Sequence, residues 1–289
     1  MASSETGHLP VRREAAGGRW ARAGGQAVLL VITALFIIPF LWIISTSLRL
    51  PKESFSLPPA IFPTAFHIEN YGDVFRAVPF VLFFLNSLKI AAAATFGQVI
   101  TSSMAAYAFA RIKFPGRDVL FFLFLTGLMI SNQVIAIPQF VLVAKARMVD
   151  NSWSLVLLWL VNPLGIFLVR QYMRSIPTSY EEAAFMDGAN RWWVFARIMV
   201  PMSAPAITVS AVTWFIAVWN DFFRPLILIN TWNKMTLPLG MTVLRGAFGN
   251  GNLSAVLAGV TLSLVPALLI YIFGQRYLVQ GLTVGGLKQ

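Results

Sequence analysis

Long, nearly uncharged apolar runs dominate this sequence of 289 residues. A helix needs about 20 apolar residues to cross the hydrocarbon core of a bilayer. Six runs of about this length occur, and each predicts one membrane-spanning helix. They are residues 28–48, 81–110, 119–144, 151–169, 203–228 and 254–275. The chain is therefore predicted to be an all-α, polytopic membrane protein.

The composition supports this class. Hydrophobic residues make up 57% of the chain, charged residues 11%, and the mean hydropathy is +0.72. Soluble domains carry about 25% charged residues, so a soluble globular protein is excluded. The net charge of +11 comes from basic residues placed between the apolar runs. That placement favours a membrane protein over a nucleic-acid-binding one.

Few residues could support catalysis or bind a metal. The chain has no cysteine, and its two histidines, His8 and His67, lie in a polar tail and a loop. Disulfide, thiolate and cysteine–metal chemistry are excluded, and an enzyme active site inside the membrane is disfavoured. No G-x-x-x-x-G-K-[ST] segment occurs, so the chain is not expected to hydrolyse ATP. We expect no catalytic residue, no metal site and no cofactor on this chain.

Lysine and arginine predict the orientation. With the N-terminus inside, the inner segments carry more of these residues than the outer ones, as the positive-inside rule requires. Residues 1–25 are then a disordered basic tail beside anionic lipid, and residues 277–289 are a cytosolic C-terminal tail. Residues 26–81 hold the first helix, too long for a signal peptide, and an outer loop. The proline-rich part of this loop, 49–80, is either a plain connection or a docking rim for an outside partner, with a short helix before Pro79.

Residues 181–201 form a charged island between two apolar runs, on the predicted cytosolic side. A helix is expected to begin here. Ser179 is a candidate N-cap because Glu182 follows at the capping-box spacing, and Thr178 with Glu181 is the alternative frame. The island is therefore predicted to be ordered.

The rest of the island predicts a helix–turn–helix. Ala183 and Ala184 give the first helix a small face that another surface can approach closely. Gly188 follows where a short helix would stop, and glycine permits the left-handed turn that reverses the chain. A second helical stretch follows, and Pro201 marks the return to the membrane.

This pattern resembles the signature of the membrane subunits of binding-protein-dependent ATP-binding-cassette (ABC) importers, in which Glu-Ala-Ala is followed by a spaced Gly and then Ile-x-Leu-Pro. Val200 stands where leucine is more usual. The resemblance extends from about residue 26 to the end, and the C-terminal segment 280–288 resembles the carbohydrate-uptake branch with its maltose and glycerol-3-phosphate permeases. Other similar segments are 86–88, 105–111, 114–117, 166–171, 219–222 and 225–226.

The resemblance implies a type I ABC importer fold, with six transmembrane helices, a cytosolic coupling helix and a transmembrane domain over residues 82–276. It implies a bacterial plasma membrane location and a second, usually different, permease chain. It also implies a cytosolic ATPase dimer that holds ATP and Mg, and an extracytoplasmic solute-binding protein. Glu182 would be the charged contact to the ATPase, although it could merely cap its helix. The implied coupling residues are Glu182, Ala183, Ala184, Asp187, Gly188, Ile198 and Pro201.

Polar residues inside the apolar runs are candidates for the transport path, because such groups are costly in lipid and tend to face a cavity. Amide and carboxylate groups beside an aromatic ring suit a sugar. The polar candidates are Asn86, Gln98, Asn132, Gln133, Asn162, Asn220 and Asp221. The set assigned to the path is Asn132, Gln133, Trp219, Asn220 and Asp221. Hydrogen bonding between helices is the alternative for Asn and Gln residues, including Asn86, Gln98 and Asn162. Asp221 could instead pair with Arg224, one turn away.

The sequence disfavours two other classes of membrane protein. An ion-coupled secondary transporter would be expected to show inverted repeats and membrane carboxylates in both halves, and neither is evident. A non-transporting scaffold would not need the pattern at 181–201. The sequence therefore favours a permease subunit of an ATP-driven importer for a sugar or sugar derivative.

Overall fold

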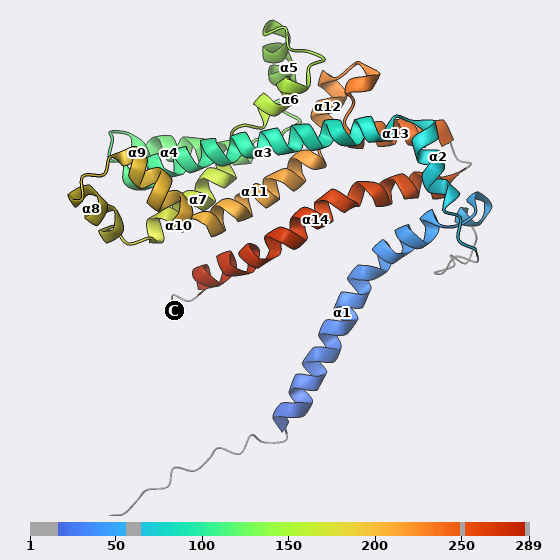
Figure 1. Cartoon of the computed structure of the whole chain (residues 1–289), viewed down its shortest axis with the longest axis horizontal. Coiled ribbons are helices and arrows are strands. Elements are labelled where there is room, and N and C mark those ends of the chain that lie inside the picture. The colour runs from blue at the N-terminus through green and yellow to red at the C-terminus, as the bar shows by residue number, and fades with distance from the viewer. Residues whose placement is uncertain (1–16, 56–64, 249–251, 287–289) are drawn as a thin grey trace, which may run out of the picture.

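The computed structural model describes residues 17–55, 65–248 and 252–286, and within these ranges every regular element is a helix. This confirms the all-α class. The chain is built around α3 (Phe80–Arg111), with α7 (Pro163–Ser175) and α11 (Ala204–Trp219) packed on it and α14 (Leu253–Gly286) against α11. In Figure 1 α3, α11 and α14 run along the long axis, and α1 (Gly17–Ser47) diverges from them.

Shorter helices lie at both ends of this bundle and along one side. The bounds are η1 Pro51–Phe55, α2 Glu69–Ala77, α4 Arg117–Thr126, η2 Gly127–Met129, α5 Ala136–Lys145, α6 Ser152–Leu158, α8 Ser179–Met186, α9 Arg191–Val194, η3 Phe195–Met199, α10 Val200–Met202, α12 Phe223–Leu228, η4 Trp232–Lys234 and α13 Leu237–Phe248. The short helix predicted before Pro79 is present as α2. Figure 1 shows α8 and α2 at opposite ends of the molecule.

By length and composition, the described part of the chain has three helices that could cross a membrane, or up to five spans if each of two bent helix pairs counts as one. Three are single helices, Gly24–Ser47, Phe80–Arg111 and Leu253–Arg276. Two are bent pairs: α6 with α7, at 44°, and the helical run Arg191–Met202 with α11, at 74°. Most of these spans overlap the runs expected from the sequence.

The expectation of six continuous spans needs correction at residues 119–144. This run is split into α4 with η2, a non-helical stretch, and α5. The break has a local cause, because the Ser131 hydroxyl bonds to the side chain of Gln133 and also accepts its backbone N–H. Such local bonds compete with the helical ladder. The run expected at 203–228 is likewise interrupted between Trp219 and Phe223.

The two tails are more helical than the sequence predicts. Helix α1 begins at Gly17, within the tail expected to be disordered to residue 25, and residues 1–16 lie outside the described part. Helix α14 continues to Gly286, beyond the predicted tail boundary at 277. Once a long helix exists, each further residue adds one hydrogen bond without a new nucleation step, and alanine and arginine near residue 20 are good helix formers.

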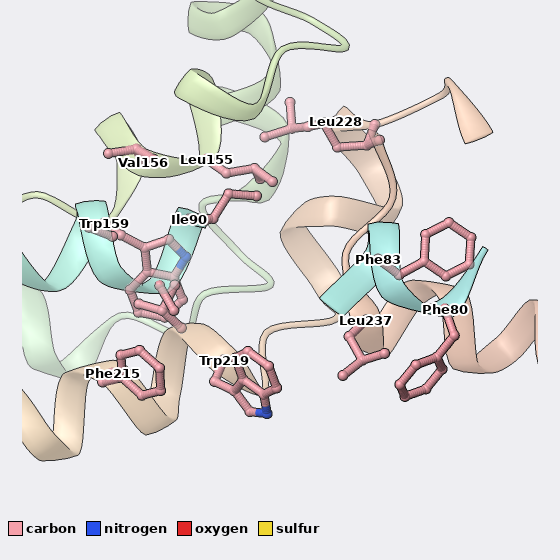
Figure 2. Packing of buried hydrophobic residues seen from close by; sticks show 14 of the residues in the cluster. Phe80, Phe83, Ile90, Leu155, Val156, Trp159, Phe215, Trp219, Leu228 and Leu237 are labelled. Carbon is pink, nitrogen blue, oxygen red and sulfur yellow. The ribbon is translucent and has the colours of Figure 1, made fainter. Parts of the chain in front are cut away.

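The apolar core lies where α3, α6, α11 and the segment from α12 to α13 meet. Figure 2 shows Leu155 and Trp159 near Ile90, Phe215 beside Trp219, and Phe80 beside Leu237. Polar contacts also bind α3 to its neighbours: Gln98 Nε2 donates to Ser210 Oγ over 3.0 Å, and Thr101 Oγ1 donates to the Leu160 carbonyl over 2.5 Å. Close packing and such bonds matter because lipid supplies no hydrophobic drive between helices.

Side-chain amides hold the end of the molecule that carries α2 and α13. Asn70 Nδ2 donates to the carbonyls of Ser47 and Arg49, over 2.9 and 2.8 Å, and so fixes the end of α1. Asn86 Nδ2 donates to the carbonyls of Asn233 and Met235, over 2.9 and 3.1 Å. Asn70 and Asn86 thus hold neighbouring segments together. The bonds of Asn70 also fix the described part of the loop 49–80 to the end of α1.

A pair of glycines in α13 offers a matched test of this packing. A Cβ at Gly240 would overlap the ring of Phe83, which is fully buried, whereas a Cβ at Gly246 meets nothing within 4 Å. We expect Gly240→Ala to lower the free energy of unfolding by about 1–3 kcal/mol through overpacking. Gly246→Ala should leave it unchanged or raise it by up to about 1 kcal/mol. Thermal unfolding of the two purified variants in detergent measures both effects, and equal midpoints would contradict this packing.

Candidate functional site

Helix α8 ends in a left-handed turn at Gly188, whose φ is +81°. The N–H of Gly188 donates to the Phe185 carbonyl over 3.1 Å, and the N–H of Ala189 donates to the Ala184 carbonyl over 2.9 Å. This pair of bonds is a Schellman motif. No atom lies within 4 Å of a Cβ added at Gly188, so glycine is required here for its backbone conformation rather than for space. The predicted turn is present.

The start of α8 differs from the prediction, because neither capping box forms. The residue preceding the helix is Thr178, which has helical backbone angles and makes no side-chain cap bond. Ser179 is already inside the helix, so it cannot be the N-cap. In the alternative frame Glu181 does not reach back to Thr178, because its carboxylate pairs with Arg111. The side chain of Glu182 is exposed, and both carboxylates still suit the positive end of the helix dipole.

The segment after the turn is ordered by a cap that sequence reasoning missed. Asn190 Oδ1 accepts the backbone N–H of Trp193 over 2.8 Å and so begins α9. An asparagine directly after the glycine–alanine turn was the available signal. The helix then widens into a π-helical turn, η3, before Pro201. Pro201 has no N–H to donate, and a π turn is one way for a helix to accommodate that loss.

The two arms of this helix–turn–helix surround an open hollow of about 530 Å³. Five of the predicted coupling residues line it: Ala183, Ala184, Asp187, Gly188 and Ile198. Glu182 is exposed outside the lining, and Pro201 lies beyond it in α10. Tyr180, Asn190 and Trp193 complete much of the rim. The structure therefore gathers most of the predicted set around one concave surface.

The surroundings of the hollow suit contact with a protein. The side chain of Met186 is 88% exposed, and Trp192 and Trp193 are also largely exposed. Ala184 is buried on the inner side of α8, in a cluster with Val194 and Met199 that holds the two arms together. Exposed apolar side chains around a concave surface are typical of an interaction site.

Arg111, the last residue of α3, fixes α8 to the membrane helices. Its Nε lies 2.7 Å from Glu181 Oε1, with both side chains buried. Its Nη2 donates to the carbonyls of Met173 and Ile176, at the end of α7, over 2.8 and 2.5 Å. Burial raises the pKa of Glu181, and the charge of Arg111 opposes that rise. Sequence reasoning assigned Glu181 only a capping role and missed this pair.

A second polar cluster lies where three helix breaks meet. Asp221 Oδ2 accepts the indole N–H of Trp159 over 3.1 Å and lies 3.5 Å from Arg224 Nη1. Arg224 Nη2 donates to Asn132 Oδ1 over 2.9 Å, and its guanidinium lies 4.0 Å from the centre of the Trp159 ring. The alternative prediction that Asp221 pairs with Arg224 is thus confirmed. Irregular backbone at membrane depth is tolerated where it is buried in protein or lines a cavity.

The helix-break cluster, defined as Asn132, Trp159, Asp221 and Arg224, contains two of the five predicted path residues. The contacts of the other three lie elsewhere. Gln133 bonds to Ser131, and the indole N–H of Trp219 donates to the Ser263 carbonyl over 3.1 Å. Asn220 Nδ2 donates to the Ile216 carbonyl over 2.9 Å. Trp159 was missed, because an aromatic residue inside an apolar run carries no distinct signal.

Among the described residues no group of three or more His, Asp or Glu side chains could hold a metal ion. The acidic groups are instead used in ion pairs, such as Asp150 with Lys234 over 2.8 Å.

Comparison with known proteins identifies the family. The profile described as "Binding-protein-dependent transport system inner membrane component" matches residues 97–284. This chain belongs to that family. Its members are permease subunits of ABC importers, in which a separate subunit hydrolyses ATP, and the protein is accordingly a multi-pass protein of the bacterial inner membrane.

Several relatives support the same assignment. The arabinooligosaccharide permease AraQ of Bacillus subtilis is 30% identical over 262 residues, covering 90% of this chain and 93% of that protein. AraQ of Halalkalibacterium halodurans is 34% identical over 227 residues, covering 78% and 81%. The galactooligosaccharide permease GanQ of Bacillus subtilis is 31% identical over 276 residues, covering 93% and 97%. A crystal structure of a bacterial importer of the acidic polysaccharide alginate matches with a TM-score of 0.78 at 22% identity, covering 91% of this chain and 98% of that one. The permease therefore has the type I importer fold.

The helix-break cluster predicts a measurable coupling between two charges. Arg224→Met leaves the Asp221 carboxylate without its cation, and breaking a buried ion pair costs about 3–5 kcal/mol. We expect the double variant Arg224→Met with Asp221→Asn to recover much of that loss, because no unpaired charge then remains. Denaturant unfolding of the wild type, both single variants and the double variant measures this cycle. Strictly additive losses would contradict the pairing.

Proposed function

We propose that this permease forms half of the translocation path of an ATP-driven importer for a sugar or sugar derivative, and that residues 181–201 couple it to a cytosolic ATPase. The observation that carries this proposal is the helix–turn–helix at the end of the bundle, with its hollow and its left-handed turn at Gly188. Glu182, exposed on α8, supplies the charged contact to the ATPase. Ala183, which is exposed, supplies the close-approach surface, and the buried Ala184 lies behind it in the lining of the hollow.

The partners follow from this role. A second permease chain completes the path, an ATPase dimer binds ATP and Mg, and an extracytoplasmic binding protein delivers the solute. A solved alginate importer in complex with an alginate-loaded periplasmic protein has this chain's fold, with a TM-score of 0.64 at 15% identity. With α8 in the cytosol, α2 and α13, at the opposite end of the molecule (Figure 1), face the outside. The positive-inside rule then puts both termini in the cytosol. The first helix faces lipid or the partner permease, since its apolar side chains from Val28 to Ile44 are mostly exposed.

The solute class rests on relatives and on chemistry. The relatives named above are described as carrying arabino- and galactooligosaccharides, and another, from Streptomyces coelicolor, as serving diacetylchitobiose uptake. The helix-break cluster offers amide, carboxylate and indole groups, which suit a polyhydroxylated solute. We place the path beside Asn132 and Asp221, with Gln133 exposed nearby along the chain.

Reconstitution tests the proposal. The permease, its partner permease, the ATPase and the binding protein are assembled in vesicles, and uptake of the sugar identified by screening the binding protein is measured. Uptake should require ATP and every subunit, and the purified permease alone should hydrolyse no ATP. Uptake driven by an ion gradient without ATP would instead favour a secondary transporter.

The turn at Gly188 gives a specific variant for this assay. Valine is disfavoured at a positive φ because of its branched Cβ, whereas asparagine tolerates the left-handed region. We expect Gly188→Val to insert and assemble but to lose at least about tenfold in ATP-driven uptake, the effect of about 1.4 kcal/mol. Gly188→Asn should retain most of the uptake. Full activity of the valine variant would contradict the coupling role of this turn.

A further inference from the structure

We propose that Arg111 is a positioning residue that makes α8 move as one body with α3 and α7, so that motion of the coupling helix reaches the membrane helices directly. This inference rests on the coupling role proposed for α8. It concerns how a movement of α8 is transmitted to α3 and α7, whereas the proposed function concerns how the ATPase moves α8.

One guanidinium joins three elements. Arg111 ends α3, its Nε lies 2.7 Å from Glu181 in α8, and its Nη2 donates to carbonyls of Met173 and Ile176 at the end of α7. The side chains of Arg111 and Glu181 are only 10% and 9% exposed. Water therefore screens this pair much less than it would screen a surface ion pair. Arginine suits the task because its planar fork presents several donors in fixed directions.

These contacts lie on both sides of the connection between α7 and α8. That connection is three residues long, from Ile176 to Thr178, and a proline in its centre offers no N–H. Arg111 holds the carbonyl of Ile176 before the connection and the carboxylate of Glu181 after it. A hinge motion of α8 about these three residues would break one of the two contacts. The remaining contacts of α8 with the body include apolar packing by Ala184, which has no comparable directionality.

The two adjacent glutamates therefore have different tasks. Successive residues of an α-helix point about 100° apart, and here Glu181 is buried while Glu182 is exposed. Glu181 faces Arg111 inside the protein, and Glu182 faces the side where the ATPase would bind. One turn of helix thus receives the partner on one face and anchors to the membrane helices on the other.

Helix α3 extends the connection to the far side of the membrane. It runs unbroken for 32 residues, about 48 Å at 1.5 Å per residue. Near its other end, Asn86 and Ser87 hold the segment before α13: Asn86 donates to the Asn233 carbonyl over 2.9 Å, and Ser87 Oγ accepts the N–H of Leu237 over 2.7 Å. A displacement of α8 that moves α3 is therefore passed to the segment that leads into α13.

The decisive variant is Glu181→Gln, which removes the charge but keeps the shape, while Arg111 retains its two carbonyl partners. The matched control is Glu69→Gln, at an exposed site on α2. In the assembled complex we expect Glu181→Gln to keep subunit assembly and basal ATPase activity. The ATP consumed per solute imported should rise about 2- to 30-fold, the range for mutations along coupling networks. The control should match the wild type. An unchanged ATP-to-solute ratio in Glu181→Gln would overturn the inference.

A distance measurement separates this inference from the proposed function. The chain has no cysteine, so spin labels can be placed at Met186→Cys and Lys113→Cys without first removing any native cysteine. The distance distribution between them should be narrow in the wild type and broader in Glu181→Gln. An equally narrow distribution in the variant would overturn the inference even if ATP-driven uptake is established. If no assembled complex imports a sugar, the proposed function fails while this measurement still reports on the link.

Discussion

Every backbone polar group in the hydrocarbon region must find a partner inside the protein, and this requirement governs how the helices of this permease can break. At the gap between α6 and α7, Trp214 Nε1 donates to the Trp159 carbonyl over 2.9 Å and Thr101 Oγ1 donates to the Leu160 carbonyl over 2.5 Å. Asn162 Oδ1 then accepts the N–H of Leu164 over 3.0 Å to begin α7. Side chains from neighbouring helices thus replace the helical ladder, and the gap is stable only within this bundle.

The end of the bundle that carries α8 meets the same requirement with a charged group. The carbonyls of Met173 and Ile176, at the end of α7, accept hydrogen bonds from the guanidinium of Arg111. Arg111 follows the apolar run of α3, and its guanidinium also pairs with Glu181. The pair connects the bundle, which is held by apolar packing and buried amides, to the helix–turn–helix. The helix–turn–helix is held by a cap, a turn and the small apolar cluster of Ala184, Val194 and Met199. Glu181 has a raised pKa because burial disfavours its charged form. The pair therefore contributes little net stability, and its value lies in the orientation it gives α8.

Sequence reasoning found the features that depend on local chemistry or composition. Apolar run length located most of the spans, and the turn at Gly188 followed from its place after a short helix. Two of the features it missed are local: the cap at Asn190, and the Ser131–Gln133 bonds at the break within 119–144. The others depend on residues distant in the chain, because the 62 positions from Arg111 to Met173, or from Trp159 to Asp221, cannot be bridged by a spacing rule. The capping boxes were mistaken for a related reason, since a tertiary ion pair took the carboxylate of Glu181 from its local role.

The two sites are connected through α7 and α3. Helix α7 is fixed to α8 at its C-terminal end, and its N-terminal end follows the gap at 159–162, which contains Trp159 of the helix-break cluster. A movement that Arg111 transmits to α7 therefore displaces the gap before α7, where side chains bond the carbonyls of Trp159 and Leu160. Such side-chain bonds can change partners without unfolding a helix. Helix α3 has no such gap and carries the same motion past this level to the segment before α13. Relative movement is thus concentrated at the helix-break cluster, beside the polar groups assigned to the transport path.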